Sequence, residues 1–261
     1  MIKINLPKKQ SNNYIKNFFY EKGLDIIIEN SKKKIIKNQP FAPNLNDLYR
    51  LYKLILINKR LTILEFGSGW STLIFSLAIR ELKKKFYKQA SSLKRENKFE
   101  LFVVENEKKY LKISKNRICN YNKIYKIKDP IKINYNLSNV EMTTFNDRIS
   151  IQYNSLPTCN PDFIYLDAPD KHSVKKSING ISIRHNDMVP MSCDILKLEY
   201  FLNPGTIIVC DGRGANASYL KDNLKRKWKY INDQENDQHI FCLKDLIIGK
   251  HNREHIEFYR S

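Results

Sequence analysis

The chain has few of the features that mark secreted, zinc-binding or membrane-spanning proteins. Its five cysteines are scattered, odd in number and form no CxxC pair, so neither a zinc site nor a disulfide framework is indicated. No apolar run approaches the roughly 18 residues that cross a bilayer. The N-terminal residues lack the apolar core and cleavage site of a secretory signal. We therefore expect a cytoplasmic protein with reduced thiols and no membrane span.

The chain also lacks a balance of charge. It has 46 lysines and arginines against 27 acids, which gives a formal net charge of +19. Such an excess normally indicates nucleic acid or another anionic partner. Lysine, asparagine and isoleucine are abundant throughout, however, as in bacterial proteins from AT-rich genomes, and the lysines cluster on short, apparently solvated faces. We interpret the charge as mainly compositional and keep nucleic acid as a disfavoured alternative partner.

Apolar periodicity divides the chain into three parts. Residues 14–37 and 45–59 carry apolar side chains at helical spacing, so we expect residues 1–60 to form a helical N-terminal extension. This extension has no separate core and is expected to pack on an α/β domain at 61–245. Residues 246–261 are expected to be a C-terminal tail.

Within the middle part, short apolar segments alternate with helical ones. We expect strands at 61–65, 99–104, 148–153, 162–166, 206–210, 229–231 and 239–243. Residues 120–147 show no clear pattern. Alternating strands and helices predict a doubly wound, mostly parallel seven-stranded sheet of the Rossmann-like α/β class, and the final hairpin makes at least one strand antiparallel.

Ligands of such sheets bind at the carboxyl ends of the strands, and acids follow four of them: Glu65, Glu105, Asp167 and Asp211. The first belongs to the turn E-F-G-S-G, which lacks the third glycine of a dinucleotide-binding motif because Thr72 occupies that position. The leading Glu65 also disfavours a phosphate. The amino group and sulfonium of S-adenosylmethionine suit a carboxylate better, and a nicotinamide-dependent oxidoreductase is a disfavoured alternative. Glu105 is placed to accept hydrogen bonds from ribose hydroxyls.

The succession E-F-G-S-G, V-V-E, Y-L-D-A-P-D and P-G-T-I-I-V-C-D resembles the class I S-adenosylmethionine-dependent methyltransferase fold over roughly residues 45–243. N-D-L-Y-R-L-Y-K-L and D-G-R-G-A-N-A are similar to segments of a poorly characterised bacterial group of this fold. The resemblance implies S-adenosylmethionine as cofactor but no settled acceptor. It places Asn154 or the ring of Tyr153 near the adenine. The expected cofactor-binding residues are Glu65, Gly67, Ser68, Gly69, Ser71, Thr72, Glu105, Asn154 and Asp167.

The segment after the fourth strand, D-A-P-D, bears on the acceptor. Methyltransferases acting on nucleobase amines carry a proline pair and an aromatic residue there, and the ring stacks on a flipped base. RNA cytosine-C5 enzymes carry a cysteine where this chain has Asp170. An RNA methyltransferase is therefore a disfavoured alternative, and we expect transfer to oxygen or nitrogen of a small molecule or saccharide. A non-catalytic binding protein of the same fold stays open.

Four residues are candidates for catalysis: Asp167, His172, Asp211 and Arg213. Asp167 or His172 could act as the general base. Alternatively Asp167, Asp211 and Asn216 could hold a divalent metal, although Asn216 is not adjacent to Asp211, which makes a metal doubtful. Arg213 could bind an anionic substrate group. The long basic loop 171–193 is expected to cover the substrate and to favour an anionic acceptor.

Overall fold

The computed structural model describes residues 2–33, 41–189 and 191–261. The chain begins with three helices: α1 (Asn12–Glu21), α2 (Asp25–Ser31) and α3 (Leu45–Ile57). The helical pattern expected over 14–37 forms α1 and α2, while its last residues, 34–37, lie outside the described residues. The side chain of Asn44 caps α3 by accepting hydrogen bonds from the backbone of Asn46 and Asp47. This cap fixes the start of a helix that reaches the candidate site.

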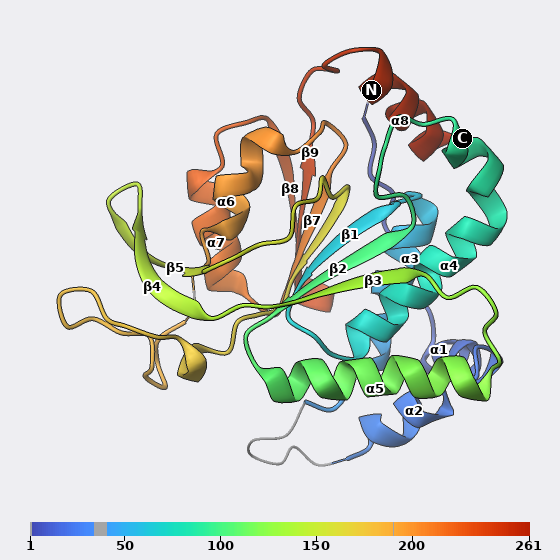
Figure 1. The fold of residues 1–261 in the computed structure, drawn as a ribbon, viewed down its shortest axis with the longest axis horizontal. Coiled ribbons are helices and arrows are strands. Elements are labelled where there is room, and N and C mark those ends of the chain that lie inside the picture. Colours follow the sequence, from blue (N-terminus) through green and yellow to red (C-terminus); the bar gives the residue numbers. More distant parts are fainter. Residues whose placement is uncertain (1, 34–40, 190) are drawn as a thin grey trace.

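A seven-stranded sheet forms the centre of the molecule (Figure 1). Its strands are β1 (Thr62–Phe66), β2 (Glu100–Glu105), β3 (Lys132–Leu137), β6 (Phe163–Leu166), β7 (Ile207–Asp211), β8 (Trp228–Asp233) and β9 (Gln238–Leu243). They lie in the order β3-β2-β1-β6-β7-β9-β8. β9 runs antiparallel to both of its neighbours, and the other pairs are parallel. The predicted doubly wound, mostly parallel sheet is confirmed, and it agrees with the resemblance to class I methyltransferases.

One predicted sheet strand is wrong. The segment 148–153 forms β5 (Arg148–Tyr153), which pairs with β4 (Val140–Phe145) in a separate antiparallel hairpin. β3, from the stretch without a clear pattern, takes the edge position in the main sheet. An edge strand is only half covered, and no residue of β3 is fully buried, so polar side chains are tolerated there. The alternation of β5 is real, but it buries Ile151 and Tyr153 against a different part of the core.

Helices cover both faces of the sheet (Figure 1). α4 (Trp70–Ser91) follows β1, α5 (Lys108–Ile124) follows β2, and both lie on the same face as α3. α6 (Asp194–Leu198) and α7 (Gly214–Asn223) lie on the opposite face. α6 is short, because residues 199–201 continue as a 3₁₀ turn. None of the helices in the described parts of the chain has the length and apolar character of a membrane span.

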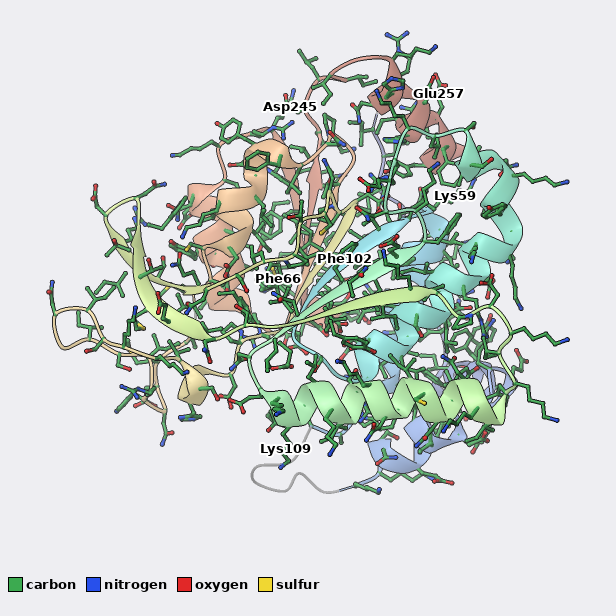
Figure 2. All side chains as sticks on the ribbon, viewed as in Figure 1. Lys59, Phe66, Phe102, Lys109, Asp245 and Glu257 are labelled. Atoms are coloured by element: carbon green, nitrogen blue, oxygen red, sulfur yellow. The ribbon has the colours of Figure 1, made fainter. Side chains whose placement is uncertain are left out.

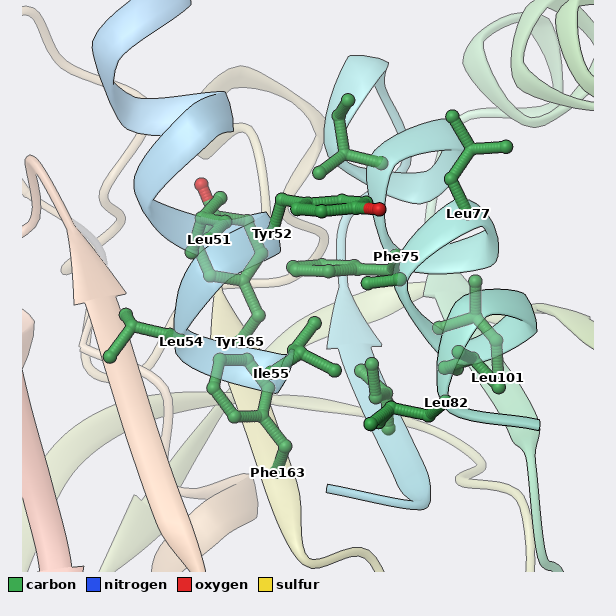
Figure 3. Close-up of a cluster of buried hydrophobic side chains, with 14 of the residues drawn as sticks. Leu51, Tyr52, Leu54, Ile55, Phe75, Leu77, Leu82, Leu101, Phe163 and Tyr165 are labelled. Carbon is green, nitrogen blue, oxygen red and sulfur yellow. The ribbon is translucent and has the colours of Figure 1, made fainter. Parts of the chain in front are cut away.

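The alternation of side chains along β1 and β2 produces two cores. Ile63 and Leu101 face the helices α3, α4 and α5, whereas Phe66 and Phe102 face the other side, where they lie at the centre of the molecule in Figure 2. In the first core, Phe75 of α4 packs edge-on against Tyr165 of β6, with ring centroids 5.3 Å apart, and Tyr52 of α3 belongs to the same cluster (Figure 3). The helices of the extension thus share one core with the α/β domain.

The expected C-terminal tail contains a helix, α8 (Lys250–Arg260), that belongs to the first core. Ile256, Phe258 and Tyr259 are buried there. The Tyr259 hydroxyl donates to Asp162 Oδ2 at 2.9 Å, and the same carboxylate accepts from the backbone of Leu61 at 3.0 Å. α8 therefore stabilises the amino ends of β1 and β6, which the polar composition of 246–261 did not reveal.

Candidate functional site

A cavity of about 890 Å³ opens at the carboxyl ends of β1, β2, β6 and β7. Its walls are formed by the segments that follow these strands, by one face of α5 and by residues 41–48 of the N-terminal extension. This is the edge of the sheet at which open α/β folds bind ligands. The cavity brings together most of the residues that the sequence analysis singled out.

Glu65 lies at the base of this cavity with only 1% of its surface exposed. Ser71 Oγ donates to Glu65 Oε1, while Oε2 is buried and has no hydrogen-bond partner among the described residues. Burial raises the pKa of Glu65 to about 8; the hydrogen bond from Ser71 opposes the shift, and the charges of Asp167 and Glu105 add to it. A carboxyl group in this position favours a ligand that brings positive charge or a hydrogen-bond donor.

Gly67 and Gly69 of the turn differ in backbone conformation and in the space around their Cα atoms. Gly67 has φ +102°, and a Cβ there would lie 2.9 Å from the Cβ of Ala168, so the fold itself requires glycine. Gly69 has an extended backbone with φ −164°. A Cβ at Gly69 would meet no heavy atom closer than Ser71 Oγ, at 3.8 Å. Open space at this position on the cavity wall leaves room for a ligand to approach the backbone.

Ser68 and Thr72 belong to the same turn but are placed differently. Ser68 lines the cavity, whereas Thr72 is fully buried and lies outside its lining. Thr72 Oγ1 accepts from the backbone of Gly69 at 3.0 Å and so caps α4. We expected Thr72 to bind the cofactor, but its side chain instead holds the backbone of the glycine turn from the buried side.

Glu105, at the end of β2, combines acceptor oxygens with a neighbouring donor. Its Oε1 accepts from the backbone of Asn106 and Glu107, each at 2.8 Å, and its Oε2 accepts from Ser68 Oγ at 2.7 Å. Burial raises the pKa of Glu105, opposed by these hydrogen bonds. The side-chain Nδ2 of Asn106 is buried without a partner in the described chain. Acceptors and a donor side by side suit a pair of hydroxyl groups.

Asn154 does not lie with these residues. It is exposed at the end of β5, outside the cavity lining, and its backbone donates to Asn139 O at 2.9 Å. The ring of Tyr153 packs against Phe66 in the second core, with ring centroids 5.7 Å apart. The displacement follows from the misassigned strand, because β5 is not part of the main sheet.

Apolar and aromatic groups on α4 and α5 instead line this side of the cavity. Trp70, Tyr110, Ile113 and Arg117 contribute to the wall, and the Arg117 guanidinium lies 3.5 Å from the centre of the Trp70 ring. The sequence analysis missed these residues. Their signal was the i, i+3, i+7 spacing of 110, 113 and 117, which places them on one face of α5. Flat, apolar surface of this kind suits a stacked heterocycle.

Three aspartates meet at the other end of the cavity: Asp47, Asp167 and Asp211. Burial raises the pKa of Asp47 to about 7; the charge of Asp211 adds to the shift, and that of Arg50 opposes it. Desolvation in the cavity raises the pKa of Asp167 to about 6, with Arg213 opposing and Asp211 adding, although 55% of its side chain is exposed. Asp47 and Asp211 further line an adjoining pocket of about 310 Å³. Asp47 was missed because it lies in the first turn of α3, before the sheet begins.

Two basic residues at the cavity, Arg213 and Lys171, are engaged with the protein. Arg213 donates to the backbone oxygens of Asp167 at 2.6 Å and Pro169 at 3.3 Å, and it pairs with the Asp167 carboxylate rather than with Asp211. Lys171 Nζ donates to backbone oxygens of the loop, including Met188 O at 3.1 Å. His172 is exposed at the cavity wall. Arg213 thus holds the segment after β6 in place.

The residues considered for a metal do not form a metal centre. Asn216 Oδ1 accepts from the backbone of Ser192 at 3.0 Å, and Asp211 Oδ2 accepts from the Tyr165 hydroxyl at 2.9 Å. Asp167 pairs with Arg213. In the described part of the chain, no group of three or more histidines, cysteines or acids is arranged to hold a metal. These donor atoms therefore do not fit a shared divalent ion.

Among the described residues of the loop 171–193, those that touch the cavity lie near its two ends: Lys171, His172, Met188 and Val189. Two bridges connect the loop to the β4–β5 hairpin, one from Lys175 to Glu141 and one from Ser192 to Ile151. Val174 and Ile183 are buried in the second core. The loop is therefore anchored to the hairpin and to the second core at these points, and its action as a lid stays a prediction.

No protein-family model matches the chain, and no curated protein matches it in sequence. Solved structures resemble it at low identity. The methyltransferase PaMTH1 of Podospora anserina, bound to S-adenosylhomocysteine, is 14% identical over 93% of this chain and 100% of that chain, with a TM-score of 0.44. An O-methyltransferase of Bacillus cereus in complex with S-adenosylhomocysteine is 12% identical over 90% and 92% of the two chains, with a TM-score of 0.40. TomG of Streptomyces achromogenes, an O-methyltransferase in complex with S-adenosylmethionine, is 11% identical over 92% of each chain, with a TM-score of 0.39. Similarity at this level identifies neither the ligand nor the acceptor of this chain.

Proposed function

We propose that the protein is an S-adenosylmethionine-dependent methyltransferase that acts on oxygen or nitrogen of a small molecule or saccharide. The observation that carries the proposal is Glu65: a buried carboxyl group, one oxygen without a partner in the described chain, beside open space at Gly69. A cationic ligand stabilises the ionised form of such a group. The missing third glycine and the acid at this turn argue against a dinucleotide.

The residues around the cavity fit the three parts of this cofactor. Glu65 and the backbone at Gly69 would hold the methionine end. Glu105 and Asn106 would hold the ribose hydroxyls through the acceptors and the free donor described above. Trp70 with the apolar face of α5 would cover the adenine. When bound, S-adenosylmethionine supplies an electrophilic methyl group on a positively charged sulfur.

The aspartates at the far end of the cavity would bind and activate the acceptor. A general base works best when its pKa lies near the working pH, and the pKa values of Asp47 and Asp167, about 7 and about 6, meet this condition. We favour Asp47, because its carboxylate receives no hydrogen bond within the described chain, whereas Asp167 is paired with Arg213. The same acids favour a neutral or cationic acceptor over the anionic one that the basic loop suggested.

Calorimetry with S-adenosylhomocysteine and with NAD tests the cofactor. We expect S-adenosylhomocysteine to bind and NAD not to bind. Glu105→Ala should lower the affinity for S-adenosylhomocysteine by about tenfold or more, because a charged hydrogen-bond acceptor is lost. Glu107→Ala is the matched control, since Glu107 lies two residues away but does not line the cavity. Absence of S-adenosylhomocysteine binding to the folded wild-type protein would overturn the proposal.

Transfer of a labelled methyl group to a panel of amines and sugars tests catalysis. Once an acceptor is found, Asp47→Asn should reduce turnover by roughly 10²- to 10⁴-fold and leave the affinity for S-adenosylhomocysteine within about twofold. A protein that binds the cofactor but transfers to no acceptor would instead support the alternative of a non-catalytic binding protein. An equal loss of cofactor affinity in Asp47→Asn would place Asp47 in the cofactor site.

A further inference from the structure

Large apolar side chains are exposed at the amino edge of the sheet, opposite the cavity. Tyr200 and Phe201, before β7, are 73% and 74% exposed, and Leu246 and Ile248, after β9, are 85% and 66% exposed. Because β9 runs antiparallel to β7, the end of β9 lies at the start of β7, and Gly205 N donates to Leu243 O at 2.9 Å. Clustered exposed apolar residues of this size usually mark an interaction surface.

Arg226 holds the two segments together. Its NH1 group donates to Leu202 O at 2.6 Å and to Glu199 O at 3.0 Å, and its Nε donates to Asp245 Oδ2 at 2.9 Å. The buried Glu199 carboxylate accepts in turn from Trp228 Nε1 at 2.8 Å. These backbone and polar groups therefore have hydrogen-bond partners inside the protein. The exposed apolar side chains lie on two loops that Arg226 holds in fixed positions.

Positive charge surrounds these loops. Lys225 and Lys227 flank Arg226, Lys250 follows the apolar segment 246–248, and all three lysines are exposed. Within the two loops, the Asp245 carboxylate pairs with Arg226 and the Glu199 carboxylate is buried. The whole chain carries a formal charge of +19, so two copies meeting face to face would repel each other. An anionic partner is electrostatically complementary.

We propose that this apolar surface (Tyr200, Phe201 and 246–248), with its three flanking lysines, docks on an anionic lipid bilayer. Aromatic and aliphatic side chains enter the headgroup boundary while lysines bind the lipid charges; this is the combination that holds peripheral proteins at membranes. Figure 2 shows Asp245 of this edge at the end of the molecule opposite Lys109, which lies at the cavity end of α5. Docking therefore leaves the cavity directed away from the lipid, and the proposal is independent of the proposed function.

Vesicle flotation tests the docking. The full chain should float with vesicles of phosphatidylcholine and phosphatidylglycerol and not with phosphatidylcholine alone. The double variant Leu246→Ser/Ile248→Ser should bind at least about tenfold more weakly, because two apolar anchors are lost. Lys225→Gln/Lys227→Gln/Lys250→Gln should weaken binding and reduce its dependence on salt. Ile124→Ser, which removes an exposed apolar side chain from the end of α5, is the matched control and should bind normally.

All substituted positions are exposed, so the variants should keep the wild-type melting temperature, which is measured alongside. The proposal is overturned if the wild-type protein does not float with the anionic vesicles, or if the Leu246→Ser/Ile248→Ser variant floats as well as the Ile124→Ser control. Self-association that sedimentation detects in the wild type and that the double variant abolishes would also overturn it, by assigning the surface to a second copy.

Discussion

Gly67 and Gly69 stand two residues apart in one turn, but alanine should affect them in different ways. At Gly67, φ +102° and the 2.9 Å approach to Ala168 make any side chain strained, so Gly67→Ala should destabilise the fold by about 1–3 kcal/mol. At Gly69 the protein leaves room for a Cβ, so Gly69→Ala should change stability by less than about 0.5 kcal/mol. Gly69→Ala should still lower the affinity for S-adenosylhomocysteine by about tenfold, because the alanine side chain fills space that the ligand needs.

Chemical denaturation and calorimetry on the two variants separate these effects. If Gly69→Ala bound S-adenosylhomocysteine like the wild type, the ligand would not pass close to this backbone, and the placing of the methionine end would be wrong. Equal loss of stability in both variants would show that the protein, rather than a ligand, needs the second glycine.

Glu65 should make the stability of the ligand-free protein depend on pH. Its pKa rises from the ordinary value of 4.5 to about 8 on folding, so between these values the folded state holds a proton that the unfolded state has lost. The stabilisation is complete below about pH 4.5 and is lost as pH rises toward 8. Glu65→Gln should flatten this fall, which amounts to at most roughly 5 kcal/mol, in denaturation curves recorded at a series of pH values.

Glu107→Gln is the control for this measurement, because Glu107 lies outside the cavity lining and its substitution should leave the pH profile unchanged. S-adenosylmethionine should bind more tightly as pH rises toward 8, since its positive charge favours the ionised Glu65. A wild-type profile that matches that of Glu65→Gln would show that Glu65 is ionised in the ligand-free protein.

Most of the strand-end residues that line the cavity could be predicted, because each lies at the end of an apolar strand. Glu65 and Glu105 needed only the end of a hydrophobic run and the rule that ligands bind there. Asp47 and Trp70 could not be found in this way. Asp47 reaches the cavity only because α3 packs on α4, which is a tertiary contact between segments that are not strand ends.

At the scale of elements, the errors have a common cause: burial decides what an apolar pattern means. β5 alternates as a sheet strand should, yet it pairs only with β4, while the polar β3 is tolerated at the sheet edge. α8 has a strongly polar composition, but its few apolar residues all lie on the face that packs on the first core. Neither outcome can be read from local spacing, because both depend on which neighbour covers the segment.

The packing of α8 can be tested through a single hydroxyl. Tyr259→Phe removes the hydrogen bond to Asp162, an acceptor that also binds the backbone at the start of β1. A hydrogen bond to a buried charged group is worth about 1.5–3 kcal/mol, and denaturation should show a loss of that size. The affinity for S-adenosylhomocysteine should not change, because this network lies at the amino edge of the sheet.

Tyr87→Phe is the matched control for that loss, since Tyr87 is an exposed tyrosine on α4 and its substitution should be close to neutral. If Tyr259→Phe were equally neutral, α8 would contribute to the fold through apolar contacts alone. A fall in S-adenosylhomocysteine affinity would mean that the two edges of the sheet are coupled.

At the scale of the whole molecule, the net charge is positive, whereas most of the charged side chains that line the cavity are acidic. The chain carries +19, but acids dominate the cavity, where Glu65, Glu105, Asp47, Asp167 and Asp211 all contribute to the lining. Lysines on the outer surface therefore attract polyanions, while the cavity repels phosphate. We therefore expect polyanions to bind the lysine-rich surface and not the cavity.

Single-stranded RNA should accordingly bind this protein weakly and without occupying the site. Because the binding is electrostatic, its affinity should fall steeply and linearly with salt on logarithmic axes. It should be the same with and without saturating S-adenosylhomocysteine, which fluorescence anisotropy of a labelled oligonucleotide measures directly. Heparin, a polyanion without bases, is the control and should show the same salt dependence. RNA affinity that changes several-fold when the cofactor site is filled, with no such change for heparin, would contradict this expectation and revive RNA as the methyl acceptor, because only a base entering the cavity would be sensitive to its occupant.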